Sequence, residues 1–177
     1  VDIEKVRGTY DWKNVDERVA DSVSRGLAVY AYIGNTPDWA RAHPDLPGHR
    51  TPPADEYADD FARFCTAVAD RYKGRVDHFF FWNEPNGCSW VSDGCGNMDG
   101  YPLYTKWLKI AYPALKKGNP DCVVGAGVLD YNSGVEKGYE YIEGMYREGA
   151  KDYFDAIVIH PYNKSRGVHW KAIHDTR

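Results

Sequence analysis

Polar side chains that are able to do acid–base chemistry follow several apolar runs of this sequence. Asn83 and Glu84 come directly after one such run, in the stretch HFFFWNEPNG. His160 and Tyr162 come directly after another, in the stretch AIVIHPY. A carboxamide, a carboxyl group, an imidazole and a phenol in one cleft suit glycoside hydrolysis, which needs one protonated carboxyl group as proton donor and a second, anionic one.

The candidate residues divide into one proton donor and several that would contact the sugar. Glu84 is the candidate proton donor, and Asn83 is placed to hydrogen-bond a sugar hydroxyl beside the reacting carbon. Trp39 and Trp90 fall on loops and are candidates for stacking on sugar rings, because flat indoles suit such contacts. The residue before a proline is pushed out of the helical region, so Pro85 predicts an extended Glu84 that continues the strand direction.

These motifs also have purely structural interpretations. Asn-Glu-Pro is commonly a turn that follows a strand. His160, which precedes a proline, is equally compatible with a hydrogen-bonded histidine of the sheet edge, and Trp39 with a loop cap. The histidines of HWKAIH are separated by five positions, which is not the spacing of a zinc pair on a helix. The sequence predicts no metal site and no cofactor.

The elements that must position these residues alternate between strand and helix. Apolar residues at helical spacing predict helices that begin near residues 14, 55, 104 and 133, and short apolar runs predict strands over 27–33, 76–82, 122–127 and 156–159. Strands that are each followed by a helix predict an α/β fold, with a parallel sheet buried on both faces. The carboxyl ends of parallel strands form one functional edge. No linker or repeat interrupts residues 1–177, which favours one domain.

Local signals refine these helices. Asn14 with Glu17 predicts a capping box at the start of the first helix, and Gly26 predicts its end. Pro113 predicts a kink or a split in the third helix. In the fourth helix, Tyr139, Ile142 and Tyr146 fall on one helical face.

Composition excludes some classes of partner. The formal net charge is −4, and the 22 lysines and arginines are scattered along the chain, which argues against nucleic acid as a partner. No apolar stretch reaches the about 18 residues of a membrane span. No secretion signal stands at the start of the sequence. Aromatic residues make up 15% of the chain, which suits both a core and a sugar-binding cleft.

The four cysteines fall into two groups. Cys65 and Cys122 lie in helical and strand-leading patterns and are expected to be small buried residues. Cys88 and Cys95 flank the loop CSWVSDGC, either as a disulfide or as free thiols. The spacing lacks the C-x-x-C form of zinc sites, and polymer-degrading enzymes tend to be exported, so the disulfide and a secreted or extracytoplasmic location are favoured.

Four landmarks in order give a more specific indication. The stretches TPDWA, FFFWNEPN, KKGNPDCVVGAG and YFDAIVIHPY together resemble the retaining glycoside hydrolases of clan A, and most of all those of family 39. The resemblance implies a (β/α) barrel of the TIM type that cleaves β-linked polysaccharides or oligosaccharides by double displacement, without a cofactor. It implies that Glu84 is the acid/base, that Asn83 contacts the neighbouring sugar hydroxyl, and that His160 and Tyr162 border the cleft.

The same resemblance implies that the barrel is incomplete. Residues 1–177 correspond to the third to sixth strands with their helices, whereas the family's nucleophile is a glutamate at the end of the seventh strand. No residue here is assigned as nucleophile, and the 177-residue chain alone is expected to be inactive. Its outer strands would need the missing part of the barrel or a second copy as cover.

Two alternatives to a glycosidase remain. A non-catalytic carbohydrate-binding or assembly protein would keep the aromatic cleft without the chemistry. Another α/β hydrolase or lyase would need its own nucleophile, and the sequence contains no G-x-S-x-G elbow.

Overall fold

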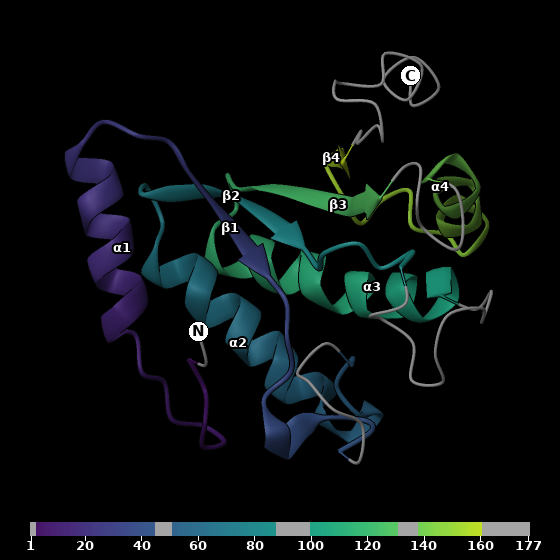
Figure 1. The fold of residues 1–177 in the computed structure, drawn as a ribbon, viewed down its shortest axis with the longest axis horizontal. Helices are drawn as coiled ribbons and strands as arrows, with labels where there is room; N and C mark the ends of the chain where they lie inside the picture. Colours follow the sequence, from purple (N-terminus) through teal and green to yellow (C-terminus); the bar gives the residue numbers. More distant parts are fainter. Residues whose placement is uncertain (1–2, 45–50, 88–99, 131–137, 161–177) are drawn as a thin grey trace.

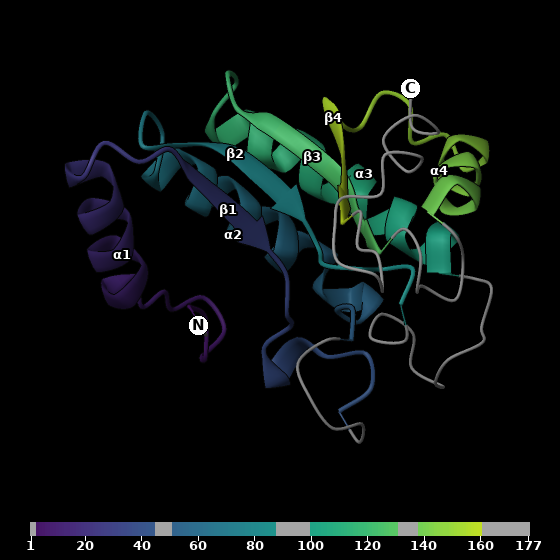
Figure 2. The ribbon, with the colours of Figure 1, turned by 45° about the horizontal axis from the view of Figure 1, so that its top comes forward.

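The fold is a four-stranded parallel sheet whose strands follow the order of the chain. The computed structural model describes residues 3–44, 51–87, 100–130 and 138–160. The sheet order is β1-β2-β3-β4, and every neighbouring pair is parallel; Figure 2 shows β1, β2 and β3 running in the same direction. The strands are β1 (Val29–Ile33), β2 (Val76–Phe81), β3 (Val123–Asp130) and β4 (Ala156–His160). The predicted α/β class and parallel sheet are confirmed.

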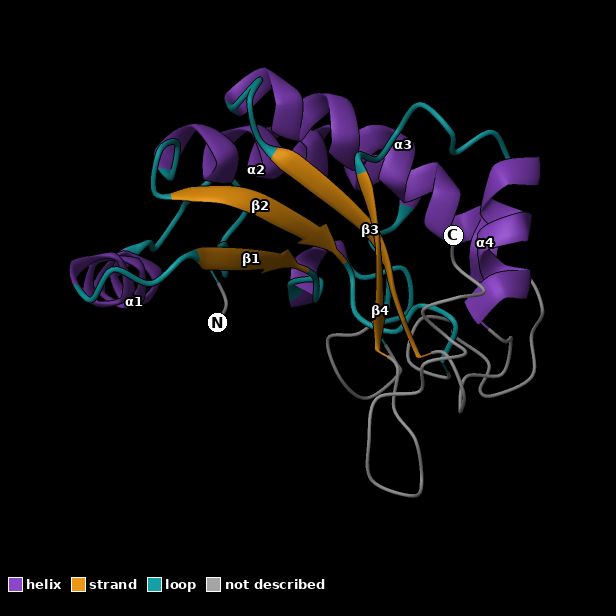
Figure 3. Ribbon diagram, turned by 90° about the horizontal axis from the view of Figure 1, so that it is seen from above, coloured by secondary structure: helices purple, strands orange, loops and turns teal. Residues whose placement is uncertain are grey.

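The first helix precedes β1, and each of the other three helices connects two successive strands. The helices are α1 (Lys13–Ser24), α2 (Ala58–Arg71), α3 (Gly100–Gly118) and α4 (Gly138–Arg147), with short 3-10 helices at Asp38–Ala40 and Asp55–Tyr57 (Figure 1). Figure 3 shows α2 and α3 along the same face of the sheet. A sheet whose strands are neighbours in chain order is the arrangement of a (β/α) barrel, whereas doubly wound folds reverse the strand order at a switch point. The structure is therefore consistent with a partial barrel.

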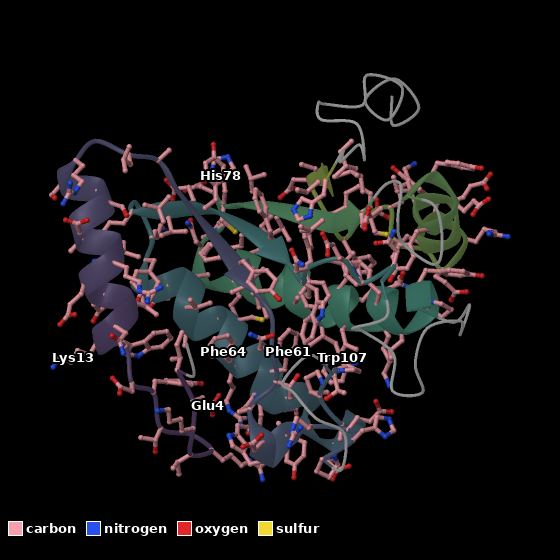
Figure 4. All side chains as sticks on the ribbon, viewed as in Figure 1. Glu4, Lys13, Phe61, Phe64, His78 and Trp107 are labelled. Atoms are coloured by element: carbon pink, nitrogen blue, oxygen red, sulfur yellow. The ribbon has the colours of Figure 1, made fainter. Side chains whose placement is uncertain are left out.

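The core lies between the sheet and the two helices α2 and α3. Phe79 and Phe81 of β2 are fully buried against this layer. Phe61 of α2 meets Trp107 of α3 edge to face, with ring centroids 5.4 Å apart, and Figure 4 labels both rings. Gly118 allows the end of α3 to approach α2 closely, because a Cβ there would lie 2.4 Å from the Thr66 carbonyl oxygen.

The opposite face of the sheet is less covered than the sequence predicts. Ile33 of β1 is buried, but Tyr30 and Tyr32, which alternate with it, are 56% and 46% exposed. Tyr30 stacks on Phe80 of β2 with ring centroids 5.6 Å apart. The prediction of burial on both faces is wrong for β1, because α2 and α3 lie along one face of the sheet and leave the face with these tyrosines exposed.

The start of the first helix also differs from the sequence prediction. Helix α1 begins at Lys13, so Asn14 lies inside the helix. Trp12, the residue before the helix, makes no capping hydrogen bond through its side chain. The Asp11 carboxylate instead accepts the Lys13 N–H at 3.2 Å. Gly26 ends this region with φ +72° as predicted.

Packing decides features of the third and fourth helices that the local signals leave open. Helix α3 runs through Pro113 as one helix rather than splitting there, since Trp107 and Leu115 are buried on either side of the proline. Tyr139 and Tyr146 of α4 are exposed, and the buried face of that helix consists of Gly138, Tyr141, Gly144 and Met145. The predicted capping box at residues 133 and 136 lies outside the described residues.

Candidate active site

Two of the candidate residues meet at the carboxyl end of the sheet. Glu84 follows β2, and His160 is the last residue of β4. His160 Nδ1 lies 2.7 Å from Glu84 Oε1, although the two residues are 76 positions apart in sequence. The His160 side chain is 27% exposed, and the Glu84 side chain is 31% exposed. When the carboxyl group is ionised, the imidazole N–H donates to it, and when it is protonated, its O–H can donate to a neutral imidazole.

The backbone at Glu84 is strained rather than extended. Glu84 has φ +49° and Trp82 has φ +59°, and such values are uncommon for residues other than glycine. The Trp82 N–H donates to the Ile33 carbonyl at 2.8 Å, and the Glu84 N–H donates to the Val128 carbonyl at 2.9 Å. The prediction that Glu84 continues the strand is therefore wrong. Hydrogen bonds to both neighbouring strands hold Glu84 in a turn. The preference of a residue before proline for an extended backbone is a local effect, and it does not take these hydrogen bonds into account.

A β-bulge in β3 supplies the carbonyl that receives the Glu84 amide. The pairing of β3 with β4 shifts between Gly127 and Leu129, so Val128 is the extra residue. Gly127 and Val128 have φ values of +92° and +44°. A bulge re-aims the strand, and here it places Asp130 opposite His160. The bulge was missed at the sequence level, although an isolated glycine inside an apolar strand is a recognised signal for one.

Asn86 is a second residue that the sequence reasoning missed. It is buried, and its Nδ2 donates to the Asp130 carbonyl at 2.6 Å, while the Asp130 N–H donates to its Oδ1 at 3.1 Å. A side-chain amide thus pairs with both backbone groups of Asp130, as a neighbouring strand would. The Gly87 N–H closes the turn on the Glu84 carbonyl at 2.8 Å, with Pro85 at the position that favours proline.

The remaining candidates have different positions. The Asn83 side chain is exposed beside Glu84 in the chain. The Trp39 indole Nε1 donates to the Glu4 carbonyl at 2.8 Å, and the ring meets Tyr57 edge to face at 5.3 Å between centroids. These contacts are with residues other than Glu84 and His160. Tyr162, Trp90, Cys88 and Cys95 lie outside the described residues.

A cavity of about 390 Å³ lies beside β1, and two carboxyl groups line it. Asp60 is buried, and its two oxygens accept hydrogen bonds from Arg7 at 2.9 and 2.7 Å. These hydrogen bonds hold the pKa of Asp60 below its usual value. Burial raises the pKa of Glu4, whose Oε1 accepts the Gly8 N–H at 2.7 Å. The arginine pairing indicates that Asp60 links the N-terminal segment to α2.

The two described cysteines are buried thiols. Cys65 and Cys122 are buried and free, as predicted, and burial raises the pKa of both thiols, which makes them poor nucleophiles. Within the described ranges, no group of three or more His, Cys, Asp or Glu residues is arranged to hold a metal ion. None of the helices in those ranges is both long and apolar enough to cross a bilayer.

Comparison with solved structures places this site in a known type of fold. A family 39 glycoside hydrolase from Bacteroides cellulosilyticus shares 25% identity at a TM-score of 0.68, over 90% of this chain and 30% of its own length. A β-xylosidase from Caulobacter crescentus shares 20% identity at a TM-score of 0.62, over 87% of this chain and 31% of its own. A family 10 xylanase from Thermobacillus composti shares 19% identity at a TM-score of 0.64, over 97% of this chain and 51% of its own.

These similarities support the resemblance to family 39 and the glycoside hydrolase fold. The chain spans about 30% of the length of the family 39 structure, which is consistent with a partial barrel. No protein-family model matches the sequence. The search of curated proteins likewise found no match.

Proposed function

We propose that this chain carries the acid/base part of a retaining O-glycoside hydrolase that acts on a β-linked polysaccharide or oligosaccharide. The observation that carries this proposal is the 2.7 Å contact between Glu84 and His160 at the carboxyl end of a barrel-type sheet. Catalytic residues of such barrels come from the carboxyl ends of their strands. A partly exposed carboxyl group fixed at that edge is able to reach both a substrate and water.

Glu84 would act twice in a double displacement. It would first give its proton to the glycosidic oxygen while a nucleophilic carboxylate attacks the anomeric carbon and the leaving group departs as an alcohol. It would then take a proton from the water that attacks the glycosyl-enzyme, which restores both carboxyl groups. His160 would orient the Glu84 carboxyl through the hydrogen bond described above.

Sugar binding would involve the other candidate residues. Asn83, exposed beside Glu84, would hydrogen-bond the hydroxyl next to the reacting carbon. Tyr162 would border the cleft, and Trp39 and Trp90 would stack on sugar rings. For Trp39 this role requires the face of the indole, since its N–H is engaged by the Glu4 carbonyl.

The nucleophile would come from outside the described residues, about 5 Å from Glu84 in a retaining site. The solved structures named β-xylosidase and xylanase make β-xylosides the first substrates to test. We also propose secretion, which the expected polymeric substrate favours.

The proposal is tested by hydrolysis of xylo-oligosaccharides in the natural protein, with whatever flanks residues 1–177 kept in place. Glu84→Gln is expected to lower kcat by about 100-fold or more, the usual range for a lost general acid. Glu17→Gln makes the same change on the exposed side of α1 and is expected to leave kcat within about twofold. Full activity in Glu84→Gln would exclude this role. Oligosaccharide binding without hydrolysis by the unaltered protein would favour the non-catalytic alternative.

A further inference from the structure

A tyrosine outside the candidate site joins β2 and β3, the two strands next to Glu84. Tyr104 of α3 is fully buried, and its hydroxyl donates to the Phe81 carbonyl at 3.0 Å. The Gly127 N–H donates to the same hydroxyl oxygen at 2.7 Å. The regular pairing of β2 with β3 ends at Phe80 and Gly125. The hydroxyl therefore bridges the two strands just beyond their last paired residues.

Both bridged backbone groups are next to the strained residues of the site. Phe81 precedes Trp82, the first residue with positive φ after β2. Gly127 precedes Val128, whose carbonyl accepts the Glu84 N–H at 2.9 Å. Holding Phe81 and Gly127 together thus fixes both the start of the turn that carries Glu84 and the carbonyl that receives its amide.

The same bulge controls the partner of Glu84. Because the extra residue is Val128, Asp130 pairs with His160 across β3 and β4. If the bulge relaxed to regular pairing, the register of β3 against β4 would shift by one residue. The side chains of β3 beyond the bulge would then turn to the other face of the sheet. The bridge from α3 therefore acts on both members of the Glu84–His160 pair.

We infer that Tyr104 is a positioning residue that sets the geometry of Glu84 and His160 from behind the sheet. The catalytic meaning of this role rests on the proposed function of Glu84, but the positioning itself is a property of the fold. Burial raises the pKa of Tyr104, so its hydroxyl stays protonated and continues to donate to Phe81.

Tyr104→Phe removes the bridge and keeps the ring. Tyr112→Phe is the matched control, because Tyr112 lies on the same helix and its hydroxyl donates to Asp155, just before β4 begins. NMR would follow the hydrogen exchange of the Glu84 amide and the imidazole nitrogen signals of His160. Tyr104→Phe is expected to speed Glu84 exchange at least tenfold relative to amides of α2 and to move the His160 signals. Tyr112→Phe is expected to do neither. A folded Tyr104→Phe with both readouts unchanged would overturn the inference.

A measurement on the unaltered chain covers the case in which Tyr104→Phe does not fold. If one bridge holds the region, the Gly127 and Glu84 amides are expected to exchange through the same opening, with the same dependence on denaturant. Glu84 exchange at least tenfold faster than that of Gly127 would show separate openings and contradict the inference. Neither readout needs hydrolysis, so an inactive protein with a positive exchange result would reject the proposed function and leave the positioning role intact.

Discussion

The residues around Glu84 combine a reactive side chain with an unfavourable backbone. Within the described ranges, Asn35, Trp82, Glu84 and Val128 are the residues other than glycine with positive φ. The first three follow the ends of β1 and β2, and Val128 lies within the last three residues of β3. Such conformations cost about 1 to 3 kcal/mol each and persist where the surroundings over-determine them. Their grouping at one edge of the sheet is typical of a functional site.

The sequence located Glu84 and His160 at this edge, because apolar runs that end in polar residues mark strand ends. It gave a turn at Asn-Glu-Pro only as the alternative to an extended Glu84, and it did not predict the pairing of the two side chains. The turn and the pairing both depend on the bulge at Val128 and on the amide of Asn86, which are contacts between segments far apart in the chain.

Asp60 gives a prediction at the same scale. Its pKa is lowered in the folded state, so its stabilising effect is present above the unfolded pKa of about 3.9 and is lost as the pH falls through the lower folded value. Asp60→Asn is expected to cost about 1 to 2 kcal/mol of unfolding free energy at pH 7, a value reduced because the side chain of its partner Arg7 is 59% exposed. The cost should shrink as the pH falls below about 3.9.

Urea unfolding at pH 7 and pH 3 measures this effect. Asp59→Asn changes the exposed neighbour and should alter stability by less than about 0.5 kcal/mol. An equal cost for Asp60→Asn at both pH values would show that the carboxylate charge does not stabilise the fold.

The elements follow local patterns except where tertiary packing overrides them. The predicted helices and strands are all present, because apolar spacing and glycine stops are local signals. Helix α3 continues through Pro113 because it is buried against α2. Helix α1 starts before Asn14, where Asp11 accepts a backbone N–H of its first turn. The layer of α2 and α3 then presents Tyr104 to the sheet.

The packing of α2 against α3 predicts a steric effect at Gly118. A Cβ at this position would lie 2.4 Å from the Thr66 carbonyl oxygen and 2.8 Å from the Asp70 nitrogen. Gly118→Ala is therefore expected to cost about 1 to 3 kcal/mol of unfolding free energy, the usual range for overpacking.

Gly100→Ala is the matched control, since the nearest atom to a Cβ at Gly100 is 3.4 Å away. Thermal and urea unfolding of the two variants measure the difference. If Gly118→Ala were as stable as Gly100→Ala, the close approach of α2 and α3 would not be tight.

At the scale of the whole molecule, the sheet formed by the described residues has two outer strands. β1 and β4 are its outer strands, and the exposed side chains of Tyr30 and Tyr32 project from β1. Strand edges of this kind promote association. The alternation of strands and helices and the resemblance to family 39 predicted this architecture from the sequence, whereas the exposure of the two tyrosines depends on which segments cover the sheet.

Residues 1–177 produced alone are expected to self-associate through this surface. Sedimentation velocity should show an average mass that rises with concentration in the micromolar range. Tyr30→Lys should weaken the association at least tenfold, because a charge on the exposed face of an outer strand opposes pairing. Tyr139→Lys, on the exposed side of α4, should not. A monomer at all concentrations would contradict this prediction.

The central claim is that Glu84 donates a proton to the leaving group, and its most direct test is the dependence of kcat/KM on that group. A dinitrophenolate departs without protonation, whereas a sugar alcohol needs the proton. In Glu84→Gln, we predict that kcat/KM for a 2,4-dinitrophenyl β-xyloside stays within about tenfold of the unaltered protein, while kcat/KM for xylobiose falls by about 100-fold or more. Equal losses on both substrates would contradict the assignment of Glu84 as the acid/base.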